Sequence, residues 1–301
     1  MDAVPRLSFI MVSYYTGPVL REAIDAVLGQ DSAIELILVN NGNPPETAGT
    51  LRELASDDPR VTLVSRPGNV GFAAACNAGC LKATGDVIVI LNPDCVVDAH
   101  CATQVLDIAA SLPSRWLLGI DIRNRDGSPQ RGARRNLPTP WIAFIELAGI
   151  YKLAPRHPYF KRINNHDTAL PGTEVPVPAV SGAFMAMRRH DYWSIGGMDD
   201  HYFLHVEDID MLLRWQKSGG QTFFTPQIQA MHAMSTSRTN WRFIEWHKTR
   251  GLCRYFRTHF ESYYPPGFIS ILQAGLYAKY FLSMIGRALS STFAPAAREK
   301  R

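Results

Sequence analysis

Asp94 is a carboxylate that directly follows a strongly apolar run of the chain. Residues 86–91 (Asp-Val-Ile-Val-Ile-Leu) are rich in β-branched side chains, which is typical of a strand buried on both faces of a parallel sheet. Because Pro93 has no backbone N–H to donate, we expect the strand to end at Asn92-Pro93-Asp94. Open α/β sheets bind their ligands outside the carboxyl ends of such strands. Asp94 is therefore a candidate for ligand binding, and the alternative is a solvated aspartate in an Asn-Pro turn.

Glu207 and Asp208 form a second group of carboxylates, at the start of a predicted helix over residues 209–218. At that position carboxylates can simply cap the helix or interact with its dipole, which contributes about 0.3–1 kcal/mol. They can also serve a site, but successive side chains at a helix start point about 100° apart. Only one of the two can therefore point directly into a crevice.

The elements before Asp94 alternate between strands and helices with short connections. Apolar runs predict strands at 7–13, 34–39, 61–64 and 86–91, and helical spacing predicts helices at 18–28, 47–55 and 72–83. This alternation implies right-handed βαβ crossovers and a parallel sheet. The strand ends at residues 13–16, 40–43 and 92–94 must then share one edge, where they line a crevice with hydrogen-bonding groups.

The second half of the chain is less regular. We predict helices at 98–110 and 141–150, strands at 116–120, 175–188 and 222–225, a long loop at 123–140 and an irregular segment at 151–172. Loops as long as the one at 123–140 are usually functional or mobile. Gly182 lies inside the run 175–188, and a glycine inside a strand often marks a close approach of the backbone to a ligand.

The bulk composition is that of an ordinary folded protein. The 301 residues are 46% hydrophobic and 19% charged, enough for one large α/β domain or two small ones. A net charge of +4 is too mild to predict a nucleic-acid partner. The five cysteines lack zinc-type spacing, and an odd number fits poorly with a disulfide framework. Since residues 1–5 have no signal-peptide layout, we predict a reducing, cytoplasmic location.

The C-terminal part, residues 238–301, differs in character. Residues 240–260 are basic and aromatic and predict a helix, and residues 268–289 are apolar and long enough to span a bilayer. Lys279, near the centre of the second stretch, would cost about 2.5–3.5 kcal/mol on insertion. We therefore predict a helix in the membrane interface, with a helix packed on the domain or in a homodimer as the alternative. Residues 296–301 predict a frayed basic tail.

Taken in order, several short motifs resemble those of family 2 glycosyltransferases, and among them the bacterial rhamnosyltransferase-like members. The motifs are Val12-Ser13-Tyr14, Val39-Asn40-Asn41-Gly42, Gly68-Asn69-Val70-Gly71-Phe72 with Asn77, Leu91-Asn92-Pro93-Asp94, Ser181-Gly182-Ala183-Phe184, Gly197-Met198-Asp199, Glu207-Asp208-Ile209-Asp210 and His232. Each is weak alone, but their combination in this order is specific.

The resemblance implies the GT-A fold, an α/β fold whose Rossmann-like, mostly parallel central sheet is flanked by helices. It implies a glycosyltransferase domain over residues 1–237, with a donor-binding part at about 1–122 and an acceptor-side part at about 123–237. Residues 238–301 would follow as a helical extension.

The family's DXD motif holds a divalent cation that bridges the two donor phosphates, and Asn92-Pro93-Asp94 occupies its position. The resemblance thus implies Mg²⁺ or Mn²⁺ bound by Asp94, while Asn92 in place of the first carboxylate lowers the charge of the site. Hard cations combine protein oxygens with phosphate oxygens and waters, so one carboxylate can suffice. His232, about 24 residues after Asp208, resembles a metal-ligating histidine of related enzymes, and the alternative is a structural histidine.

The resemblance assigns Asp208 as the catalytic base, which takes the proton of the attacking acceptor hydroxyl. One base with in-line attack implies inversion at the anomeric carbon. Glu207 would support Asp208 or contact the acceptor. Asp210 would lie at the surface or behind the base.

The resemblance also implies how a nucleotide-sugar donor binds. Ser13 and Tyr14 would lie near the base and ribose. Asn40 stands where the family usually has an aspartate that accepts a pyrimidine N–H, and an amide oxygen can still accept that bond. The donor-binding loop and helix would include Asn69, Gly71 and Asn77. For Gly71 the alternative is a plain turn glycine.

Together with this resemblance, the sequence predicts a metal-dependent, inverting glycosyltransferase at the inner face of the cytoplasmic membrane, with a surface glycan or lipid-linked acceptor. The likeness to rhamnosyltransferases alone implies that it moves L-rhamnose from dTDP-rhamnose. A UDP-sugar is the alternative donor. A sugar-1-phosphate nucleotidyltransferase would need a cationic phosphate loop, which residues 13–17 lack. A non-catalytic sugar-nucleotide-binding protein is disfavoured by the joint presence of Asp94, Asp208 and His232. Three arginines belong either to a solvated loop or to a contact with the pyrophosphate or an anionic acceptor: Arg131, Arg134 and Arg135.

Overall fold

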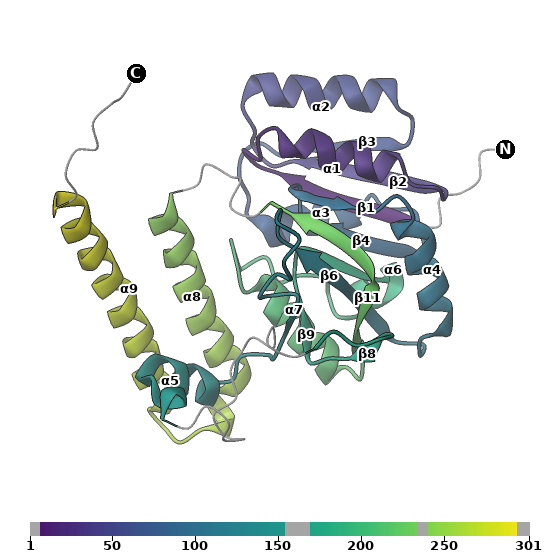
Figure 1. Cartoon of the computed structure of the whole chain (residues 1–301). Coiled ribbons are helices and arrows are strands. Elements are labelled where there is room, and N and C mark those ends of the chain that lie inside the picture. Colours follow the sequence, from purple (N-terminus) through teal and green to yellow (C-terminus); the bar gives the residue numbers. More distant parts are fainter. Residues whose placement is uncertain (1–6, 154–168, 234–239, 294–301) are drawn as a thin grey trace. The chain divides into compact units, whose positions relative to one another are not determined.

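The computed structural model of the protein (Figure 1) describes residues 7–153, 169–233 and 240–293, with side chains as far as residue 287. The chain forms two compact units. The sheet unit comprises residues 1–137 and 162–239, and the helical unit comprises residues 138–161 and 240–301. The predictions for residues 1–5, for most of the segment 151–172 and for the tail at 296–301 lie outside the described residues.

Four parallel strands form one half of the main sheet (Figure 1). They are β1 (Leu7–Ser13), β2 (Ile34–Asn40), β3 (Val61–Ser65) and β4 (Val87–Leu91), in the order β3-β2-β1-β4. The register pairs Ser13 with Asn40 and Met11 with Leu91, so the loops after β1, β2 and β4 leave the sheet at the same edge. The predicted parallel sheet and its shared edge are confirmed.

Three helices connect these strands: α1 (Val19–Leu28), α2 (Pro45–Asp57) and α3 (Phe72–Cys80). A further helix, α4 (Cys101–Ser111), comes after β4 in the chain. The small residues of α3 let it lie close to the sheet. A Cβ atom added to Gly79 would come within 2.6 Å of Ile10 Cγ2 and 3.0 Å of Val39 Cγ2, so this helix touches both β1 and β2 at a glycine.

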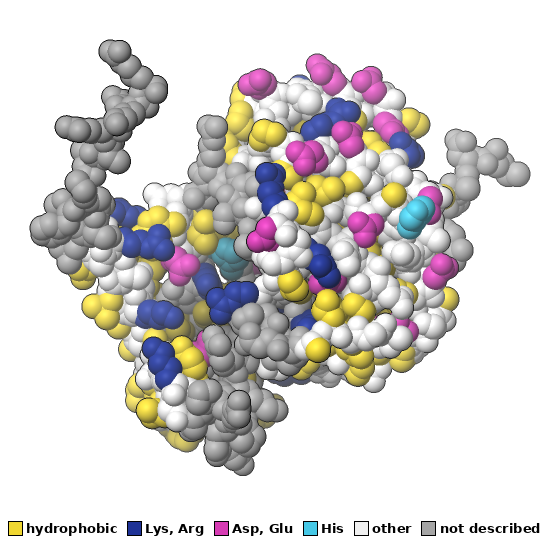
Figure 2. All heavy atoms as spheres, viewed as in Figure 1, with side chains coloured by type: hydrophobic (Ala, Val, Ile, Leu, Met, Phe, Trp, Pro, Cys, Tyr) yellow, Lys and Arg dark blue, Asp and Glu magenta, His cyan; other side chains and the backbone are white. Residues whose placement is uncertain are grey.

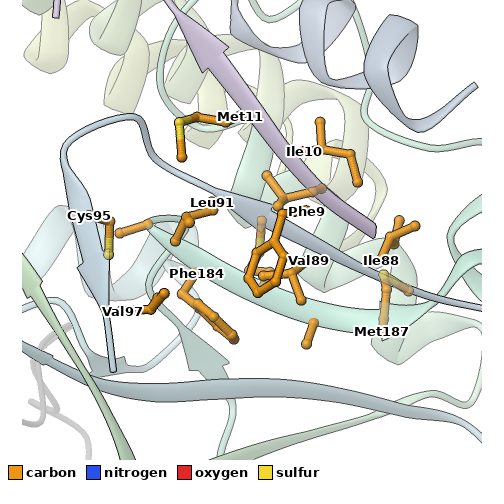
Figure 3. Close-up of a cluster of buried hydrophobic side chains, with 14 of the residues drawn as sticks. Phe9, Ile10, Met11, Ile88, Val89, Leu91, Cys95, Val97, Phe184 and Met187 are labelled. Atoms are coloured by element: carbon orange, nitrogen blue, oxygen red, sulfur yellow. The ribbon is translucent and has the colours of Figure 1, made fainter. Parts of the chain in front are cut away.

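The apolar side chains of the central strands pack into one continuous core (Figure 3). Phe9 of β1, Val89 and Leu91 of β4, and Phe184 are fully buried. Burial of a large apolar side chain contributes about 1.5–3 kcal/mol relative to exposure, so these strands form a stable base. The polar residues that follow the strands are thus attached to a rigid core.

The other half of the sheet mixes directions. β10 (Phe184–Arg188) pairs antiparallel with β4 and with β6 (Trp116–Arg123), and β11 (Gln221–His232) runs parallel to β6. The short strands β5 (Cys95–Val97) and β8 (Val175–Pro176) pair antiparallel with β11. A separate ribbon joins β7 (Arg134–Arg135) to β9 (Ala179–Val180). Two helices, α6 (Arg189–Ser194) and α7 (Glu207–Lys217), complete the described elements of this unit.

Several boundaries in this half were predicted wrongly. The run 175–188 is three short strands, because β8, β9 and β10 pair with different partners. The strand predicted at 222–225 continues to His232 across a register shift between Thr225 and Gln229. Pro226, which cannot donate to a ladder, lies inside that shift. β7 falls inside the predicted loop at 123–140, and β5 was not predicted.

The helical unit contains α5 (Pro140–Ala148), α8 (Trp241–Phe260) and α9 (Phe268–Phe293), with 3₁₀ turns at Ile150–Lys152 and Glu261–Tyr263. Thr139 caps α5 by accepting a hydrogen bond from the Ile142 N–H at 3.2 Å. A Cβ atom added to Gly275 of α9 would lie 2.6 Å from Leu147 Cδ2 of α5. The helix that we predicted within the acceptor-side part thus packs against the C-terminal helix.

One face of α9 is buried and another is exposed. Ile269 and Leu272 are 2–3% exposed. Ile271, Phe281, Leu282 and Ile285 are between 55% and 71% exposed. By length and composition alone, Phe268–Arg287 could cross a membrane. The helix α9 therefore has an exposed apolar face.

Candidate active site

Asp94 and His232 meet in the sheet unit, although 138 residues separate them along the chain. His232 is the last residue of β11 and pairs with Cys95 of β5, the residue after Asp94. The His232 Nε2 atom lies 3.0 Å from Asp94 Oδ1 and 3.3 Å from Asn92 Nδ2. Only 11% of the His232 side chain and 10% of the Asp94 side chain are exposed. Strand pairing therefore builds a buried carboxylate–imidazole cluster.

Gln130 orients the His232 ring. Its Oε1 atom lies 2.9 Å from His232 Nδ1, and its Nε2 atom donates to Asn124 Oδ1 at 3.2 Å. Because the amide nitrogen is used toward Asn124, the amide oxygen faces the ring, and Nδ1 must be the atom that donates. In a neutral ring, Nε2 then presents its lone pair toward the Asp94 carboxylate. Two electron-rich atoms in contact need a proton or a cation between them.

Asp208 lies against residues 181–183. A Cβ atom added to Gly182 would come within 2.7 Å of Asp208 Oδ2, and the Ala183 carbonyl accepts the Asn92 N–H at 2.9 Å. The segment 181–183 therefore contacts the base candidate and also the Asn92-Pro93-Asp94 turn. The close approach predicted at Gly182 exists, but it is to a side chain of the protein.

Arg135 forms an ion pair with Asp208, and its Nε atom donates to the Val180 carbonyl at 3.3 Å. The other Asp208 oxygen, Oδ1, accepts the Ile209 N–H at 2.8 Å. The side chains of Arg135 and Asp208 are 18% and 15% exposed. Both carboxylate oxygens are thus held in place. The alternative of a solvated loop is wrong for Arg135.

Glu207, the neighbour of Asp208 in the chain, lies in a more buried environment. It is 6% exposed, and burial, together with the nearby charge of Asp208, raises the pKa of Glu207 to about 8. Among the described residues its Oε2 atom has no hydrogen-bond partner. His205 and Val206, which lead into α7, have φ values of 64° and 76°, a conformation that costs non-glycine residues about 1–3 kcal/mol. This strained turn leaves Glu207 inside and Asp208 beside residues 181–183.

The family is decided by comparison with known proteins. Residues 8–196, more than half of the chain, match the model of glycosyl transferase family 2. The chain belongs to glycosyltransferase family 2. Residues 165–238, which include Asp208 and His232, also match a model described as the N-terminal domain of galactosyltransferase.

Relatives of this family 2 glycosyltransferase include a rhamnosyltransferase. The N-acetylglucosaminyl-diphospho-decaprenol L-rhamnosyltransferase of Mycobacterium tuberculosis is 28% identical over 250 residues, which cover 77% of this chain and 78% of the relative. The O-antigen biosynthesis protein RfbC of Myxococcus xanthus is 24% identical over 249 residues, 78% of this chain but 18% of that protein. The chain is thus a rhamnosyltransferase-like member of the family, as the motifs predicted.

Solved structures support the GT-A fold. The mannosyltransferase PcManGT of Pyrobaculum calidifontis, in complex with GDP-Man and Mn²⁺, matches with a TM-score of 0.58 and 17% identity over 99% of this chain and 77% of that chain. GalNAc-T7 with UDP, GalNAc and Mn²⁺ matches with a TM-score of 0.61 and 15% identity over 97% of this chain and 58% of that chain. At such identities the likeness is one of fold.

The loops after β1 and β2 of this glycosyltransferase are joined by Asn43. The Asn43 Nδ2 atom donates to the Ser13 carbonyl at 2.9 Å and to Asn40 Oδ1 at 3.0 Å, and the Asn43 N–H also donates to Asn40 Oδ1 at 3.0 Å. Both lone pairs of the Asn40 amide oxygen therefore have protein donors. This differs from the role predicted for Asn40 as acceptor of a base N–H. Tyr14 is half-buried and its ring lies 4.8 Å from that of Tyr15.

Asn69 and Gly71 belong to the same set of loops. The Asn69 Oδ1 atom accepts hydrogen bonds from Asn41 Nδ2 and from the Gly71 N–H, each at 3.0 Å. Gly71 has a φ of 89°, and an added Cβ atom would lie 2.7 Å from the Phe203 carbonyl oxygen. A turn with a close backbone contact is sufficient to explain this glycine.

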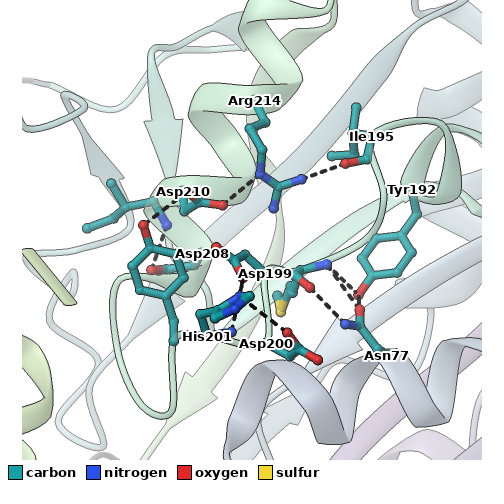
Figure 4. A network of polar contacts seen from close by, with 12 residues as sticks. Asn77, Tyr192, Ile195, Asp199, Asp200, His201, Asp208, Asp210 and Arg214 are labelled. Carbon is teal, nitrogen blue, oxygen red and sulfur yellow. Dashed lines mark hydrogen bonds and ion pairs between the residues drawn. The ribbon is translucent and has the colours of Figure 1, made fainter. Parts of the chain in front are cut away.

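Asn77 and Asp210 have internal partners (Figure 4). The Asn77 amide donates to the Met198 carbonyl at 2.8 Å and accepts from the Met198 N–H and the Tyr192 hydroxyl. It therefore fastens α3 to the turn before Asp199, and its place in a donor-binding helix stays a prediction. Asp210 is 1% exposed and pairs with Arg214 at 2.7 Å, so of its two predicted placements, at the surface or behind the base, the one at the surface is wrong.

A second group of possible metal ligands lies near this turn. The ligand atoms of Asp199, Asp200 and His201 lie within 4.8 Å of one another (Figure 4). Asp200 and His201 are exposed, in contrast to the buried pair of Asp94 and His232. We assign no role to this exposed group.

Sequence reasoning missed Gln130 and Asn43 as parts of the site. Asn43 lies in the turn Asn40-Asn41-Gly42-Asn43, where repeated asparagines could have suggested side chains that hydrogen-bond nearby loops. Gln130 has no such signal, because its contact with His232 depends on how residues 123–137 cross the sheet end.

Proposed function

We propose that this glycosyltransferase is metal-dependent and inverting, and that it moves L-rhamnose from dTDP-rhamnose to a lipid-linked or glycan acceptor. The observation that carries the proposal is that residues 181–183 contact both parts of the site. Gly182 adjoins Asp208, and Ala183 accepts a hydrogen bond from Asn92, in the turn that brings Asp94 to His232. The rhamnose donor is supported by the relative that is named for L-rhamnosyl transfer to a decaprenol-linked sugar.

The residues of the first cluster fit a divalent cation. The His232 Nε2 and Asp94 Oδ1 atoms are 3.0 Å apart, a separation that suits two ligands bonded to one ion at about 2.0–2.2 Å. An imidazole with its Nδ1 proton bound by Gln130 is ready to ligate through Nε2. When bound there with the donor phosphates, Mg²⁺ or Mn²⁺ would offset the charge of the departing nucleoside diphosphate.

The chain's own residues account for the remaining chemistry. Asp208 would take the proton of the acceptor hydroxyl as that oxygen attacks the anomeric carbon, and attack opposite the leaving group inverts the configuration. Ser13, Tyr14 and the loop around Asn69 would surround the nucleoside. Glu207, protonated at neutral pH because of its raised pKa, would support the helix start and leave proton abstraction to Asp208.

Replacement of Asp208 tests the base assignment. Asp208→Asn keeps the shape but cannot take a proton, so we expect kcat to fall by about 10²–10⁴-fold while the affinity for the nucleoside diphosphate stays close to that of the wild type. Exposed Asp200→Asn is the matched control and should retain activity. Unchanged turnover by Asp208→Asn would show that another residue is the base.

A thermal-shift panel tests the donor. The wild-type protein would be heated with dTDP-rhamnose, UDP-glucose, UDP-galactose and GDP-mannose, each with and without Mn²⁺. Ligand at 100-fold its Kd stabilises a protein by about 2.7 kcal/mol, so the true donor should raise the melting temperature most, and only with the metal. A larger shift with a UDP-sugar would establish the alternative donor. Equal shifts without metal would contradict metal dependence.

We also propose that the helical unit lies on an anionic membrane surface at the cytoplasmic side. The exposed face of α9 is apolar, and residues 240–287 contain seven Lys or Arg against two Glu. Figure 2 shows hydrophobic and basic side chains side by side on this unit. Apolar contact together with basic residues is the pattern that holds interfacial helices on anionic lipids, and a lipid-linked acceptor would be presented there.

Vesicle sedimentation of the full chain tests this surface. Leu282→Glu with Ile285→Glu should release the protein from phosphatidylglycerol vesicles, while Ser283→Glu, on the same helix but off the apolar face, should not. Binding that is the same for all three proteins would contradict the proposal. Loss of a dimer by light scattering in the double variant, without any vesicle binding by the wild type, would assign the face to a second copy.

A further inference from the structure

We propose that Gln130 and Arg135 are positioning residues for the two halves of the active site. Gln130 would set the His232 ring for metal binding, and Arg135 would set the Asp208 carboxylate for proton transfer. The two residues are five apart in one loop. The inference rests on the proposed function, since it takes His232 as a metal ligand and Asp208 as the base.

The loop backbone is anchored independently of these two side chains. The Gln130 N–H donates to the Ile122 carbonyl at 2.9 Å, and the Ala133 N–H donates to the Gln130 carbonyl at 3.1 Å. Arg135 lies in β7, which pairs with β9. A change in either side chain therefore leaves backbone hydrogen bonds that hold the loop.

The Gln130 side chain is suited to fix a tautomer. It is 7% exposed, and Asn124 takes its amide N–H while its oxygen accepts from His232 Nδ1. Asn124 is fixed in turn, because its Nδ2 atom donates to Ser128 Oγ at 2.9 Å. This chain of hydrogen bonds leaves Nε2 as the ligating atom of the ring. Partners of this kind commonly change metal affinity or activity by about 10–100-fold when they are removed.

Arg135 acts on the other half. Its guanidinium contacts Asp208 Oδ2 and the Val180 carbonyl, so the side chain bridges β9 and the start of α7. The planar guanidinium has its donors in a fixed geometry, and the Ile209 N–H holds the second carboxylate oxygen. A carboxylate has about four lone-pair sites, so these contacts orient Asp208 and leave lone pairs that can take a proton.

Two pairs of variants separate the two roles. Gln130→Met removes the acceptor, whereas Gln130→Glu keeps it. Arg135→Met removes the guanidinium, whereas Arg135→Lys keeps the charge. For each protein we would measure Mn²⁺ binding by titration in the presence of dTDP, and kcat and KM with the donor established by the panel. Circular dichroism would show that each variant is folded.

We expect the Gln130 variants to change metal binding and the Arg135 variants to change turnover. Gln130→Met should weaken Mn²⁺ binding by about 10–100-fold, and Gln130→Glu should restore it. Arg135→Met should leave Mn²⁺ binding unchanged and lower kcat by about 10²-fold, as expected for a misplaced catalytic group, with little change in donor KM, and Arg135→Lys should recover part of the loss. If both Met variants disturb metal binding and turnover alike, the loop is only structural and the proposal is overturned.

A third measurement distinguishes this proposal from failure of the proposed function. If Asp94→Ala and His232→Ala bind Mn²⁺ like the wild type, the metal assignment itself is wrong. In that case the ¹⁵N signals of the His232 ring in the metal-free protein still test whether Gln130 positions the ring. A ring protonated at Nδ1 in the wild type that changes tautomer in Gln130→Met supports its positioning role, and an unchanged ring overturns it.

Discussion

At the residue scale, burial gives two adjacent carboxylates different chemistry. Glu207 is enclosed and its pKa is raised to about 8, first by burial and then by the charge of Asp208. Asp208 is 15% exposed and is held by Arg135. A carboxyl group with a raised pKa stays protonated to a higher pH, so the environment, rather than the residue type, favours Asp208 over Glu207 as the proposed base.

The raised pKa of Glu207 predicts a pH-dependent stability. In the unfolded chain this group ionises near its ordinary value of 4.5, but in the folded protein it ionises at about 8. Between these values the folded state binds more protons, so this group's contribution is complete below the lower value and is lost as pH rises through the upper one. The free energy of unfolding should fall by up to about 1.4 kcal/mol per pH unit in this window.

Glu207→Gln checks this prediction, because it copies the protonated acid and cannot ionise. Urea denaturation between about pH 5 and pH 8 should show a shallower pH dependence for the variant than for the wild type. Glu22→Gln, at an exposed position of α1, is the control and should follow the wild type. Identical slopes for the wild type and Glu207→Gln would mean that Glu207 is ionised in the folded protein.

Gly182→Ala should damage catalysis more than folding. The new Cβ atom would come within 2.7 Å of Asp208 Oδ2, so the carboxylate must shift from its present position. A shift of about 1 Å in a catalytic group can cost about 10²-fold in rate. Steady-state kinetics would measure the loss in kcat, with Gly172→Ala, where an added Cβ has open space, as the control. A fully active Gly182→Ala protein would argue against Asp208 as the base.

The sequence points to a site residue where a carboxylate stands at the end of a strand or at the start of a helix. Asp94 follows a continuous apolar strand and a proline, and Asp208 opens a helix, so the amino-acid pattern makes both of them candidates. The resemblance to the family then favours Asp94 as a metal ligand and Asp208 over Glu207 as the base. The partners of these residues could not be selected in this way. Arg135 reaches Asp208 through the pairing of β7 with β9, and Asn40 turns its oxygen to Asn43, and neither contact leaves a periodic pattern.

At the element scale, the sequence predicts the first half of the sheet well because each strand is a continuous apolar run bounded by turn residues. In residues 175–188 the same approach fails, since three short strands with different partners look like one strand in the sequence. The extension of β11 to His232 is also determined by pairing with β5 and β6. Long-range partners, rather than local propensity, set these boundaries.

A glycine in α3 tests how closely this helix must pack on the sheet, and a glycine in α2 serves as the control. Gly79→Ala would place a Cβ atom 2.6 Å from Ile10 Cγ2 and 3.0 Å from Val39 Cγ2, and overpacking of this kind typically costs about 1–3 kcal/mol. Gly49→Ala in α2 meets open space and should stabilise the protein by about 0.5–1 kcal/mol through helix propensity. Chemical denaturation measures both. Stabilisation by Gly79→Ala would mean that α3 can move away from the sheet without cost.

At the scale of the whole molecule, the chain crosses between its two units. The helical unit takes residues 138–161 from the middle of the sequence and 240–301 from its end. The sequence suggested a simple C-terminal extension, because α5 has the apolar composition of any core helix. Only its packing, with Phe144 near Phe268 at 5.9 Å between ring centroids and Leu147 against Gly275, reveals that it belongs with α9.

This division predicts the outcome of two truncations. A chain ending at residue 239 leaves α5 without α9, so Phe144 and Leu147 lose their partners, and exposed apolar patches of this kind promote aggregation. A second protein, in which residues 138–161 are also replaced by a flexible Gly/Ser linker, should be soluble and monomeric by size-exclusion chromatography. Because Asp94, His232 and Asp208 all lie in the sheet unit, dTDP with Mn²⁺ should still stabilise it, by about 2.7 kcal/mol at 100-fold the Kd.

Equal solubility of the two proteins would show that α5 does not depend on α9. A soluble second protein that no longer responds to the nucleotide would place part of the binding site in the helical unit.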